Sequence, residues 1–373
     1  MKIVGKDNEF ARHSLLVRIP QILTQCINQL YVGKHSKQIE QLGKLIYDLK
    51  RNKALDLFED ELPDYEDWKR ALMEQKDGKE LLYFDCPWLF SECYIYRRLQ
   101  SIVSDISIDV FKQEKMKALQ FTIESFQLPL TMAKKEGLFA RLLGSLWGNQ
   151  MDLSLHVNMG NMPIHDLDLD KLILNDFEEL WKTIQHIDNG TIVIVLDNVA
   201  SEFINDLFLA DFLIENQFAK TIIFHCKAMP WFVSDVTLSD VKDTMDALES
   251  SPDLKKYALK WKTWTNDKFI FKKDYYWTLP YCFNEIEQQN KFLYQELHSA
   301  DLVIFKGDLN YRKLTQDQLS DTIEISMGYN TLAIRTCKSD TLLGVSKEKR
   351  NQLDKIDEKW RVNGKYGIIQ FLK

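Results

Sequence analysis

One short segment, residues 191 to 196, constrains the fold more than any other part of the sequence. It reads Thr-Ile-Val-Ile-Val-Leu. A β-branched run with no polar side chain after Thr191 predicts a strand that is buried on both faces of a parallel sheet. Asp197 and Asn198 follow directly, and a helix-like stretch from Ser201 to Phe212 comes next. Ligands bind such sheets at the carboxyl edge of the strands, so we expect the chemistry of this protein at Asp197 and Asn198.

From about residue 140 onward, short apolar runs alternate with longer amphipathic segments. This alternation predicts an α/β fold, which we expect to be a three-layer α/β/α, Rossmann-like core sheet. Polar residues come directly after each predicted strand. If the strands are parallel, these residues lie together along the carboxyl edge of the sheet. The predicted strands are residues 191–196, 221–226, 302–306 and 331–335.

The rest of the chain is predicted to be mainly helical. Residues 1–140 contain few strand-like runs and are expected to form a helical N-terminal domain, with residues 141–373 as the α/β core. Pro20 suits a first helical turn, and apolar residues recur after it at helical spacing. Residues 243–295 interrupt the alternation and are predicted to be a helical insertion over the carboxyl edge of the sheet. Further N-terminal helices are predicted at 36–50, 88–99 and 115–126.

The composition narrows the class of protein. With 45% hydrophobic residues, a chain of 373 residues can bury a sizeable core. The net charge of −7 argues against a nucleic-acid partner. The six cysteines form no Cys-x-x-Cys pair, which favours reduced thiols in the cytoplasm, with the nucleus left open as a second location.

Nothing in the sequence predicts a membrane segment. The N-terminus lacks the apolar core of a signal peptide, and no run reaches the ~18 apolar residues that would span a bilayer. We therefore expect no membrane association, and no obligate protein partner is evident.

Three oxygen-bearing side chains, those of Asp197, Asn198 and Asp235, suit a hard or borderline divalent cation such as Mg²⁺ or Mn²⁺. Two carboxylates would neutralise the ion, and the amide would add a neutral ligand. Such a site leaves coordination positions for water or a phosphate oxygen. The alternative is that these side chains only cap the helices that follow them.

Positively charged residues crowd the ends of the last two predicted strands. Lysine or bidentate arginine would match a phosphate, although charged residues also gather at any solvent-facing strand end. Gly307 would let the backbone turn closely against a ligand. The cations in question are Lys306, Arg312, Arg335 and Lys338.

Weaker candidates lie elsewhere in the chain. Asn149 and Asp152 flank a predicted turn, and a purely structural turn explains them as well as a binding loop does. Glu92 shares a predicted helix with Arg97 and Arg98, where a solvated face or an interdomain salt bridge is the default interpretation.

Several longer motifs occur in a fixed order along almost the whole chain. They are Arg18-Ile-Pro20, Tyr83 to Arg98, Leu146 to Ser154, Asp197-Asn198, Asp206 to Phe212, Pro230 to Asp235, Lys306 to Leu314 and Arg335-Thr-Cys-Lys338. Together they resemble the metal-dependent damage-control phosphatase family, first catalogued as domain of unknown function 89. The Arg-Thr-x-Lys signature marks the branch that contains the acidic-residue methyltransferase homologues.

The resemblance implies a site. It implies that Asp197, Asn198 and Asp235 bind the divalent metal, usually manganese, cobalt, nickel or magnesium. Four further residues are candidates to hold the metal-binding and substrate-binding side chains in position without touching the substrate. They are Glu92, Asn149, Asp152 and Arg335. The phosphorylated substrate would be held by Asp197, Asn198, Asp308, Leu309, Asn310, Tyr311, Arg312 and Lys338. Proteins that look like this hydrolyse small phosphometabolites, typically fructose 1-phosphate and fructose 6-phosphate, and so remove reactive phosphosugars.

One departure from the family pattern lies beside the site. Where the family commonly reads Asp-Asn-Ala-Gly, this chain reads Asp197-Asn198-Val199-Ala200. A glycine has become alanine, but every implied ligand is retained.

The sequence therefore predicts a metal-dependent phosphomonoesterase. Its attacking group is open between a metal-bound water and a carboxylate. The alternative is an S-adenosylmethionine-dependent protein-glutamate O-methyltransferase. Against it, no two glycines are separated by a single residue, so the glycine-rich turn with which doubly wound sheets bind nucleotides is missing.

Overall fold

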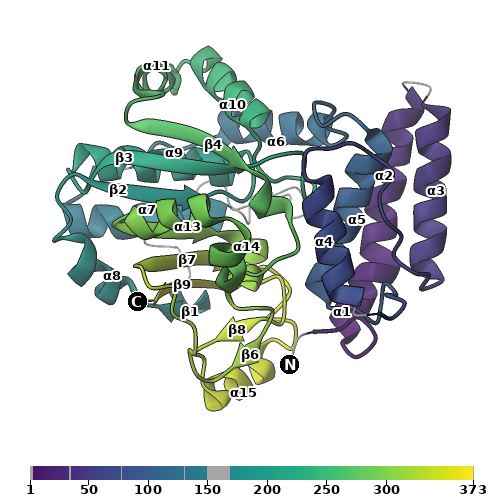
Figure 1. Ribbon diagram of the computed structural model, residues 1–373. Helices are drawn as coiled ribbons and strands as arrows, with labels where there is room; N and C mark the ends of the chain where they lie inside the picture. The colour runs from purple at the N-terminus through teal and green to yellow at the C-terminus, as the bar shows by residue number, and fades with distance from the viewer. Residues whose placement is uncertain (1–2, 33–34, 77, 130, 149–168, 373) are drawn as a thin grey trace.

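The computed structural model describes residues 3–32, 35–76, 78–129, 131–148 and 169–372. Their strands are β1 (Leu172–Asn175), β2 (Gly190–Val195), β3 (Ala219–Lys227), β4 (Phe269–Asp274), β5 (Leu302–Lys306), β6 (Leu319–Ser320), β7 (Thr331–Thr336), β8 (Leu342–Leu343) and β9 (Gly367–Leu372). Seven of them form one sheet in the order β1-β9-β7-β5-β2-β3-β4 (Figure 1). Neighbouring strands pair in parallel except β7 and β9, which are antiparallel. The prediction of a mixed α/β fold is confirmed.

The four predicted strands correspond to β2, β3, β5 and β7, and the sequence analysis missed three others in the main sheet. Strand β9 reads Gly-Ile-Ile-Gln-Phe-Leu and is buried throughout. Its Gln370 interrupts the apolar pattern, but the structure satisfies this side chain internally. Tyr311 Oη donates to Gln370 Oε1 at 2.7 Å, and Gln370 Nε2 donates to the backbone oxygen of Leu343 at 3.0 Å. Only the tertiary fold reveals these partners.

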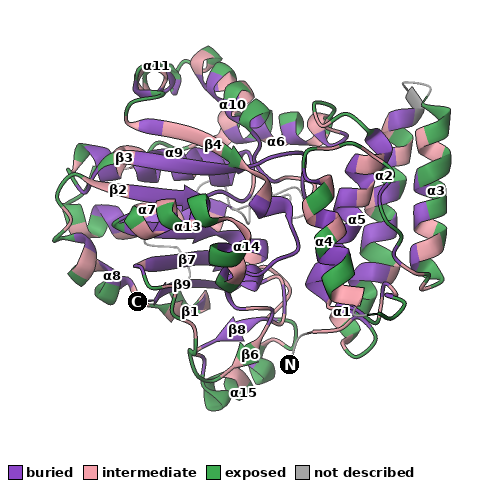
Figure 2. Ribbon diagram, viewed as in Figure 1, coloured by how far each residue is buried: buried purple, intermediate pink, exposed green. Residues whose placement is uncertain are grey.

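Strand β2 shows why the sheet is buried on both faces. Ile192 and Ile194 pack into one hydrophobic cluster, whereas Val193 and Val195 pack into another, and all four are fully buried. Alternate residues of a strand point to opposite faces, so each face has its own core. Figure 2 shows the central strands buried along most of their length. Each such side chain stabilises the fold by about 1.5–3 kcal/mol.

The N-terminal part of the described chain is helical, as predicted. It comprises α1 (Glu9–His13), a π-helical segment (Ser14–Arg18), α2 (Ile19–Val32), α3 (Ser36–Lys50), α4 (Tyr65–Lys76), α5 (Trp88–Val103) and α6 (Lys112–Ser125). These helices stand beside the sheet (Figure 1). Helix α5 is buried along almost its whole length, and its side chains share one hydrophobic cluster with a face of the sheet. The boundary at residue 140 stays a prediction.

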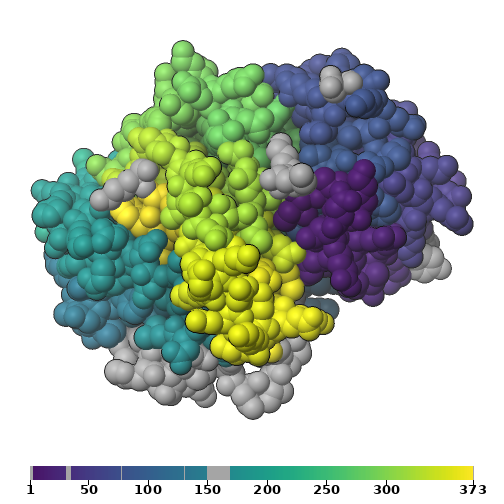
Figure 3. Space-filling model, turned by 90° about the horizontal axis from the view of Figure 1, so that it is seen from below, coloured from purple at the N-terminus to yellow at the C-terminus, as the bar shows by residue number. Residues whose placement is uncertain are grey.

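The N-terminal helices also contact the C-terminal part of the chain. Asn8 Nδ2 donates to Asp340 Oδ2 at 3.0 Å, and Figure 3 shows the first residues packed against the last third of the chain. The remaining helices are α7 (Lys134–Trp147), α8 (Phe177–Ile184), α9 (Ser201–Glu215), α10 (Leu238–Ser250), α11 (Lys255–Trp264), α12 (Ile286–Gln289), α13 (Lys291–Ser299), α14 (Gly307–Leu314) and α15 (Lys347–Ile356). No helix in the described ranges has the length and the apolar character needed to cross a bilayer.

The stretch from 243 to 295 differs from the helical insertion that the sequence analysis expected. It contains α11 but also β4, which pairs in parallel with β3 and forms an edge of the main sheet. Strand β4 reads Phe-Ile-Phe-Lys-Lys-Asp, so only three apolar residues precede the charged ones. That run is too short to be recognised as a strand from the sequence.

Candidate functional site

A cavity of about 330 Å³ lies where the loops after β2 and β3 meet the N-terminal helices and the start of α14. Asp197 follows β2, Asp308 follows β5 and Lys338 follows β7, and all three line this cavity. The predicted gathering of polar residues at the carboxyl edge is therefore what the structure shows. A cavity of this size suits a small metabolite rather than a large ligand.

The three predicted metal ligands come together although Asp235 is far from the other two in the sequence. The loop after β3 forms a bridge to the loop after β2, in which Asn198 pairs with Asp235. Val236 N donates to the backbone oxygen of Asp197 at 2.8 Å, and Ser234 Oγ donates to Asn198 Oδ1 at 2.6 Å. Backbone pairing between the two loops thus fixes the relative positions of the two carboxylates and the amide.

Both carboxylates are buried, which makes their charge costly. Burial, followed by the neighbouring charges of Glu202 and Asp235, raises the pKa of Asp197 well above its usual range. Burial likewise raises the pKa of Asp235 to about 6, although Lys227 opposes the shift. Asp235 Oδ2 is buried without a hydrogen-bond partner among the described residues, and Lys227 Nζ lies 3.3 Å away in an ion pair. Burial is the largest cause of both shifts, so a cation bound here would favour the charged form of the two carboxylates.

This donor set fits a divalent cation. No group of three or more His, Cys, Asp or Glu side chains in the described part of the chain is arranged to hold a metal. The fit rests instead on two carboxylates and one amide oxygen, which are donors that Mg²⁺ and Mn²⁺ accept. Asp235 Oδ2 accepts no hydrogen bond in the described part of the chain and has only the 3.3 Å ion pair with Lys227, so it keeps lone pairs that a cation could use.

Lys306, which the sequence offered as a phosphate-binding cation, lies beneath the site instead. Its side chain is fully buried, and Nζ lies 3.1 Å from Glu202 Oε1 and 3.1 Å from Asp206 Oδ1. Nζ also donates to the backbone oxygen of Ser145 at 2.9 Å. All its hydrogen-bonding capacity is used internally.

Glu202 is a site residue that the sequence analysis missed. Asn198 Nδ2 donates to Glu202 Oε2 at 3.0 Å and to Asp197 Oδ2 at 2.6 Å. Glu202 therefore joins the buried Lys306 to the amide of Asn198 and holds that amide in orientation. Its place in the first turn of α9, one turn after Asn198, was the available signal.

Residues 308 to 312, which the resemblance implies hold the substrate, lie in the first turns of helix α14. The first residue of that helix, Gly307, has a φ of 82°, which favours glycine. Leu309 lines the cavity. Asn310 Nδ2 donates to the backbone oxygen of Lys306 at 2.7 Å, and Tyr311 Oη donates to Gln370, so neither of these side chains lines the cavity.

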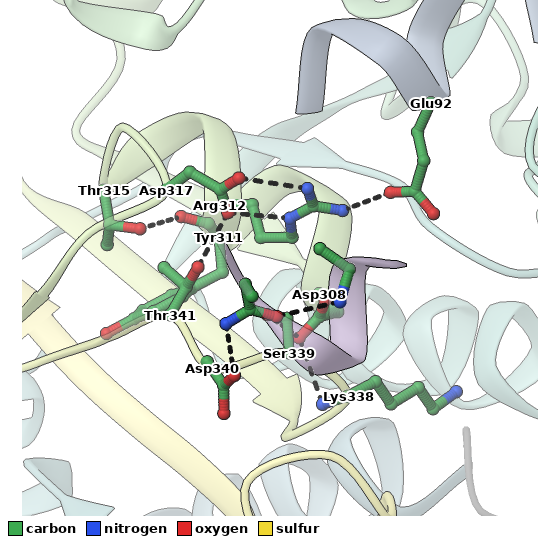
Figure 4. A network of polar contacts seen from close by, with 12 residues as sticks. Glu92, Asp308, Tyr311, Arg312, Thr315, Asp317, Lys338, Ser339, Asp340 and Thr341 are labelled. Atoms are coloured by element: carbon green, nitrogen blue, oxygen red, sulfur yellow. Dashed lines mark hydrogen bonds and ion pairs between the residues drawn. The ribbon is translucent and has the colours of Figure 1, made fainter. Parts of the chain in front are cut away.

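Asp308 organises the loop after β7 (Figure 4). Its Oδ1 accepts hydrogen bonds from Lys338 N and Ser339 Oγ, both at 3.1 Å, and lies 3.2 Å from Arg335 NH1. The side chain of Lys338 extends away from this network, as Figure 4 shows, and lines the cavity. Asp308 and Arg335 thus fix the backbone from which Lys338 is presented.

Arg312 also lines the cavity, but carboxylates already surround its guanidinium group (Figure 4). Arg312 NH1 donates to Glu92 Oε2 at 2.6 Å, and Nε donates to Asp317 Oδ1 at 2.8 Å. The guanidinium lies 3.7 Å from the ring centre of Trp88. Glu92, expected to support the site, holds Arg312 in the structure, and its part in function stays a prediction. The other two supporting candidates, Asn149 and Asp152, lie outside the described residues.

The chain is similar to known proteins over nearly its full length. Residues 15–353 match the model of the damage-control phosphatase ARMT1-like domain. A protein named damage-control phosphatase ARMT1 from Homo sapiens is 32% identical, with 98% of this chain and 97% of that protein covered. Its counterpart of the same name from Danio rerio is 31% identical, with 98% and 95% covered. The crystal structure of a DUF89 family protein from Pyrococcus horikoshii has the same fold, with a TM-score of 0.54 at 15% identity and both chains covered in full.

Proposed function

Because the chain belongs to the damage-control phosphatase ARMT1-like family, we propose that it is a metal-dependent phosphomonoesterase that hydrolyses small phosphometabolites. One observation carries the proposal. A single small cavity contains the two buried carboxylates Asp197 and Asp235, the amide of Asn198, and the ammonium group of Lys338. The proposed substrates are sugar phosphates such as fructose 1-phosphate and fructose 6-phosphate, whose size suits a cavity of about 330 Å³.

In this proposal Asp197, Asn198 and Asp235 hold a divalent cation, with Mn²⁺ first and Ni²⁺, Co²⁺ or Mg²⁺ as alternatives. When bound, the cation would polarise the phosphoryl group and stabilise negative charge in the transition state. Glu202 accepts from the Asn198 nitrogen and Ser234 donates to its Oδ1, so the amide is fixed at both ends while Oδ1 keeps a second lone pair for the cation. Fixed donors of this kind need no rearrangement during the reaction.

The protein groups around the cation would orient the ester. Lys338 offers a positive charge to the phosphate, and the hydrogen bond from its backbone nitrogen to Asp308 keeps it on the cavity wall. Ile22, Trp88 and Phe232 line the same cavity with apolar surface. Such surface excludes water from around the bound ester, which strengthens the electrostatic interactions inside.

Phosphate release from fructose 1-phosphate, measured with and without Mn²⁺, tests this proposal. We expect release that depends on the metal, and a loss of about a hundredfold or more in Asp197→Ala. Asp188→Ala is the matched control, because Asp188 is exposed and precedes β2 at the opposite edge of the sheet. Full activity of Asp197→Ala would contradict the proposed mechanism.

The comparisons do not favour the methyltransferase alternative. In the structure, β2 leads into Asp197-Asn198-Val199-Ala200 rather than a glycine-rich turn. Calorimetric titration of the protein with S-adenosylmethionine checks this point directly, and we expect no heat of binding.

A further inference from the structure

The cations that line the cavity differ in how much of their charge is already neutralised. Lys115, from α6, lies with its Nζ 2.8 Å from both Asp109 Oδ2 and Asp240 Oδ2. Its Nζ also donates to the backbone oxygen of Asp235 at 2.9 Å. Two carboxylates and a carbonyl occupy this ammonium group. The cavity-lining cations of the described residues are Arg18, Lys115, Arg312 and Lys338.

Arg312 is neutralised in the same way. Asp317 binds it through two hydrogen bonds, of 2.8 Å from Nε and 3.1 Å from NH2, and Glu92 accepts a third from NH1. Two negative charges therefore surround one positive charge. A phosphate dianion that approached Arg312 would meet a net negative group, so Arg312 holds the wall together rather than attracting the substrate.

Arg18 differs from Lys115 and Arg312. No hydrogen bond or ion pair joins its side chain to any other residue in the described ranges, yet it lines the cavity. It is exposed, so its guanidinium group is accessible to a ligand. All five N–H donors of this group are available, and they suit the bidentate recognition of phosphate.

The backbone at Arg18 departs from a regular α-helix. Ser14–Arg18 is a π-helical segment inserted between α1 and α2, and such segments occur frequently at functional sites. Ser14 Oγ, at the start of the segment, donates to Glu92 Oε1 at 3.0 Å. Glu92 in turn holds Arg312, so the segment is anchored to the cavity wall. Arg18 is the last residue of this segment and lines the cavity.

We propose that Arg18 binds the phosphoryl group of the substrate and supplies the second positive charge that the site needs, beside Lys338. A phosphomonoester carries between about 1.5 and 2 negative charges near neutral pH. Asp197 and Asp235 are reserved for the metal, and Lys115 and Arg312 are already neutralised. This inference rests on the proposed function, because it assigns the charge that its substrate class requires.

The test compares Arg18→Gln and Arg18→Lys with the control Arg12→Gln. Arg12 is exposed on α1 and does not line the cavity. The measurements are kcat and KM for fructose 1-phosphate with Mn²⁺, and the inhibition constant of inorganic phosphate. In Arg18→Gln we expect KM and the inhibition constant to rise together by about tenfold to a hundredfold, with kcat little changed. Arg18→Lys should recover part of the loss, and Arg12→Gln should match the wild type.

Two results would overturn the inference. One is an Arg18→Gln protein with the KM and phosphate inhibition of Arg12→Gln. The other is a raised KM with unchanged phosphate inhibition, since the contact would then lie elsewhere on the substrate. A wild-type protein that releases no phosphate from any ester would instead contradict the proposed function. Calorimetric titration of inorganic phosphate into the same proteins would still decide the role of Arg18.

Discussion

The backbone of Gly307 lies directly against the carboxylate of Asp197. A Cβ atom added to residue 307 would come within 1.8 Å of Asp197 Oδ2, and the φ of Gly307 is 82°. Gly307 connects the end of β5 to the first turn of α14, so the two neighbouring strands β2 and β5 deliver their polar residues to one point. The sequence analysis anticipated a close approach of this backbone to a ligand. The structure shows a close approach to one of the proposed metal ligands.

Gly307→Ala should therefore damage the site. The added methyl group must displace the Asp197 carboxylate, and the backbone conformation disfavours any L side chain. We expect phosphate release to fall by about tenfold or more and the free energy of unfolding to fall by about 1–3 kcal/mol. Phosphate assays and chemical denaturation measure the two effects.

The control for this variant is Gly43→Ala. Gly43 lies in helix α3, where an added Cβ would meet nothing within 4 Å. Alanine in a helix should stabilise the protein by about 0.5–1 kcal/mol and leave phosphate release unchanged. Equal behaviour of the two alanine variants would show that the contact between Gly307 and Asp197 has no importance.

Binding of Mn²⁺ should stabilise the folded protein. The buried carboxylates of Asp197 and Asp235 repel each other, and a bound divalent cation would relieve this repulsion. A ligand at 100 times its dissociation constant adds about 2.7 kcal/mol to the free energy of unfolding. We expect Mn²⁺ to raise the unfolding temperature of the wild type and of Asp188→Asn, but not of Asp235→Asn. A chelator should reverse the increase, and an equal increase in all three proteins would place the metal elsewhere.

Loss of Lys306 should be far more harmful than loss of a surface lysine. Lys306→Met leaves the buried carboxylates of Glu202 and Asp206 without their cation, and breaking a buried ion pair costs about 3–5 kcal/mol. Lys182 pairs with Glu179 on the exposed surface of α8, where solvent screens the pair, so Lys182→Met should leave the free energy of unfolding nearly unchanged. Urea denaturation of both variants tests the difference. A small effect of Lys306→Met would mean that the buried network contributes little to stability.

The contact between Glu296 and His225 should make stability depend on pH. His225, which is hydrogen-bonded to Glu296 at 2.7 Å, and Lys272 lower the pKa of the Glu296 carboxyl to about 2. Because this pKa is lower in the folded than in the unfolded protein, the contact stabilises the fold above about pH 4.5. The stabilisation is lost as the pH falls toward 2.

Glu296→Gln should therefore lower the free energy of unfolding at pH 7. We expect a loss of about 1 kcal/mol, since Glu296 is partly exposed and solvent screens the interaction. The difference from the wild type should shrink as the pH falls from 5 to 3. Glu287→Gln, at an exposed position, is the control and should show no such trend. A difference that stays constant with pH would mean that the charge of Glu296 is unimportant.

The sequence was most informative where local pattern decides structure. A buried parallel strand needs a continuous apolar run, so β2 could be recognised, and its carboxyl end located the site. The pairing of Asn198 with Asp235 could be expected only in outline, because it depends on how two loops meet. The presence of both residues on one cavity wall agrees with that outline.

The sequence was less informative about charge. Lys306, Arg312 and Lys338 all lie at or shortly after the end of a strand, and the sequence alone does not distinguish them. In the structure Lys306 is buried among acids, Arg312 is neutralised by two carboxylates, and Lys338 lines the cavity. The partners of a cation come from distant parts of the chain, such as Glu92 in α5, so no local pattern distinguishes these three roles.

The hydrophobic cluster shared by α5 and the sheet has a consequence for synthesis on the ribosome. Helix α5 emerges early, whereas the residues of β5 and β7 in the same hydrophobic cluster follow about 200 residues later. At 5–20 residues per second, roughly 10 to 40 seconds separate the synthesis of this helix from that of the strands that complete the cluster. In a newly made chain the N-terminal side of this cluster can therefore pack first, and its sheet side is completed only when these strands have been made.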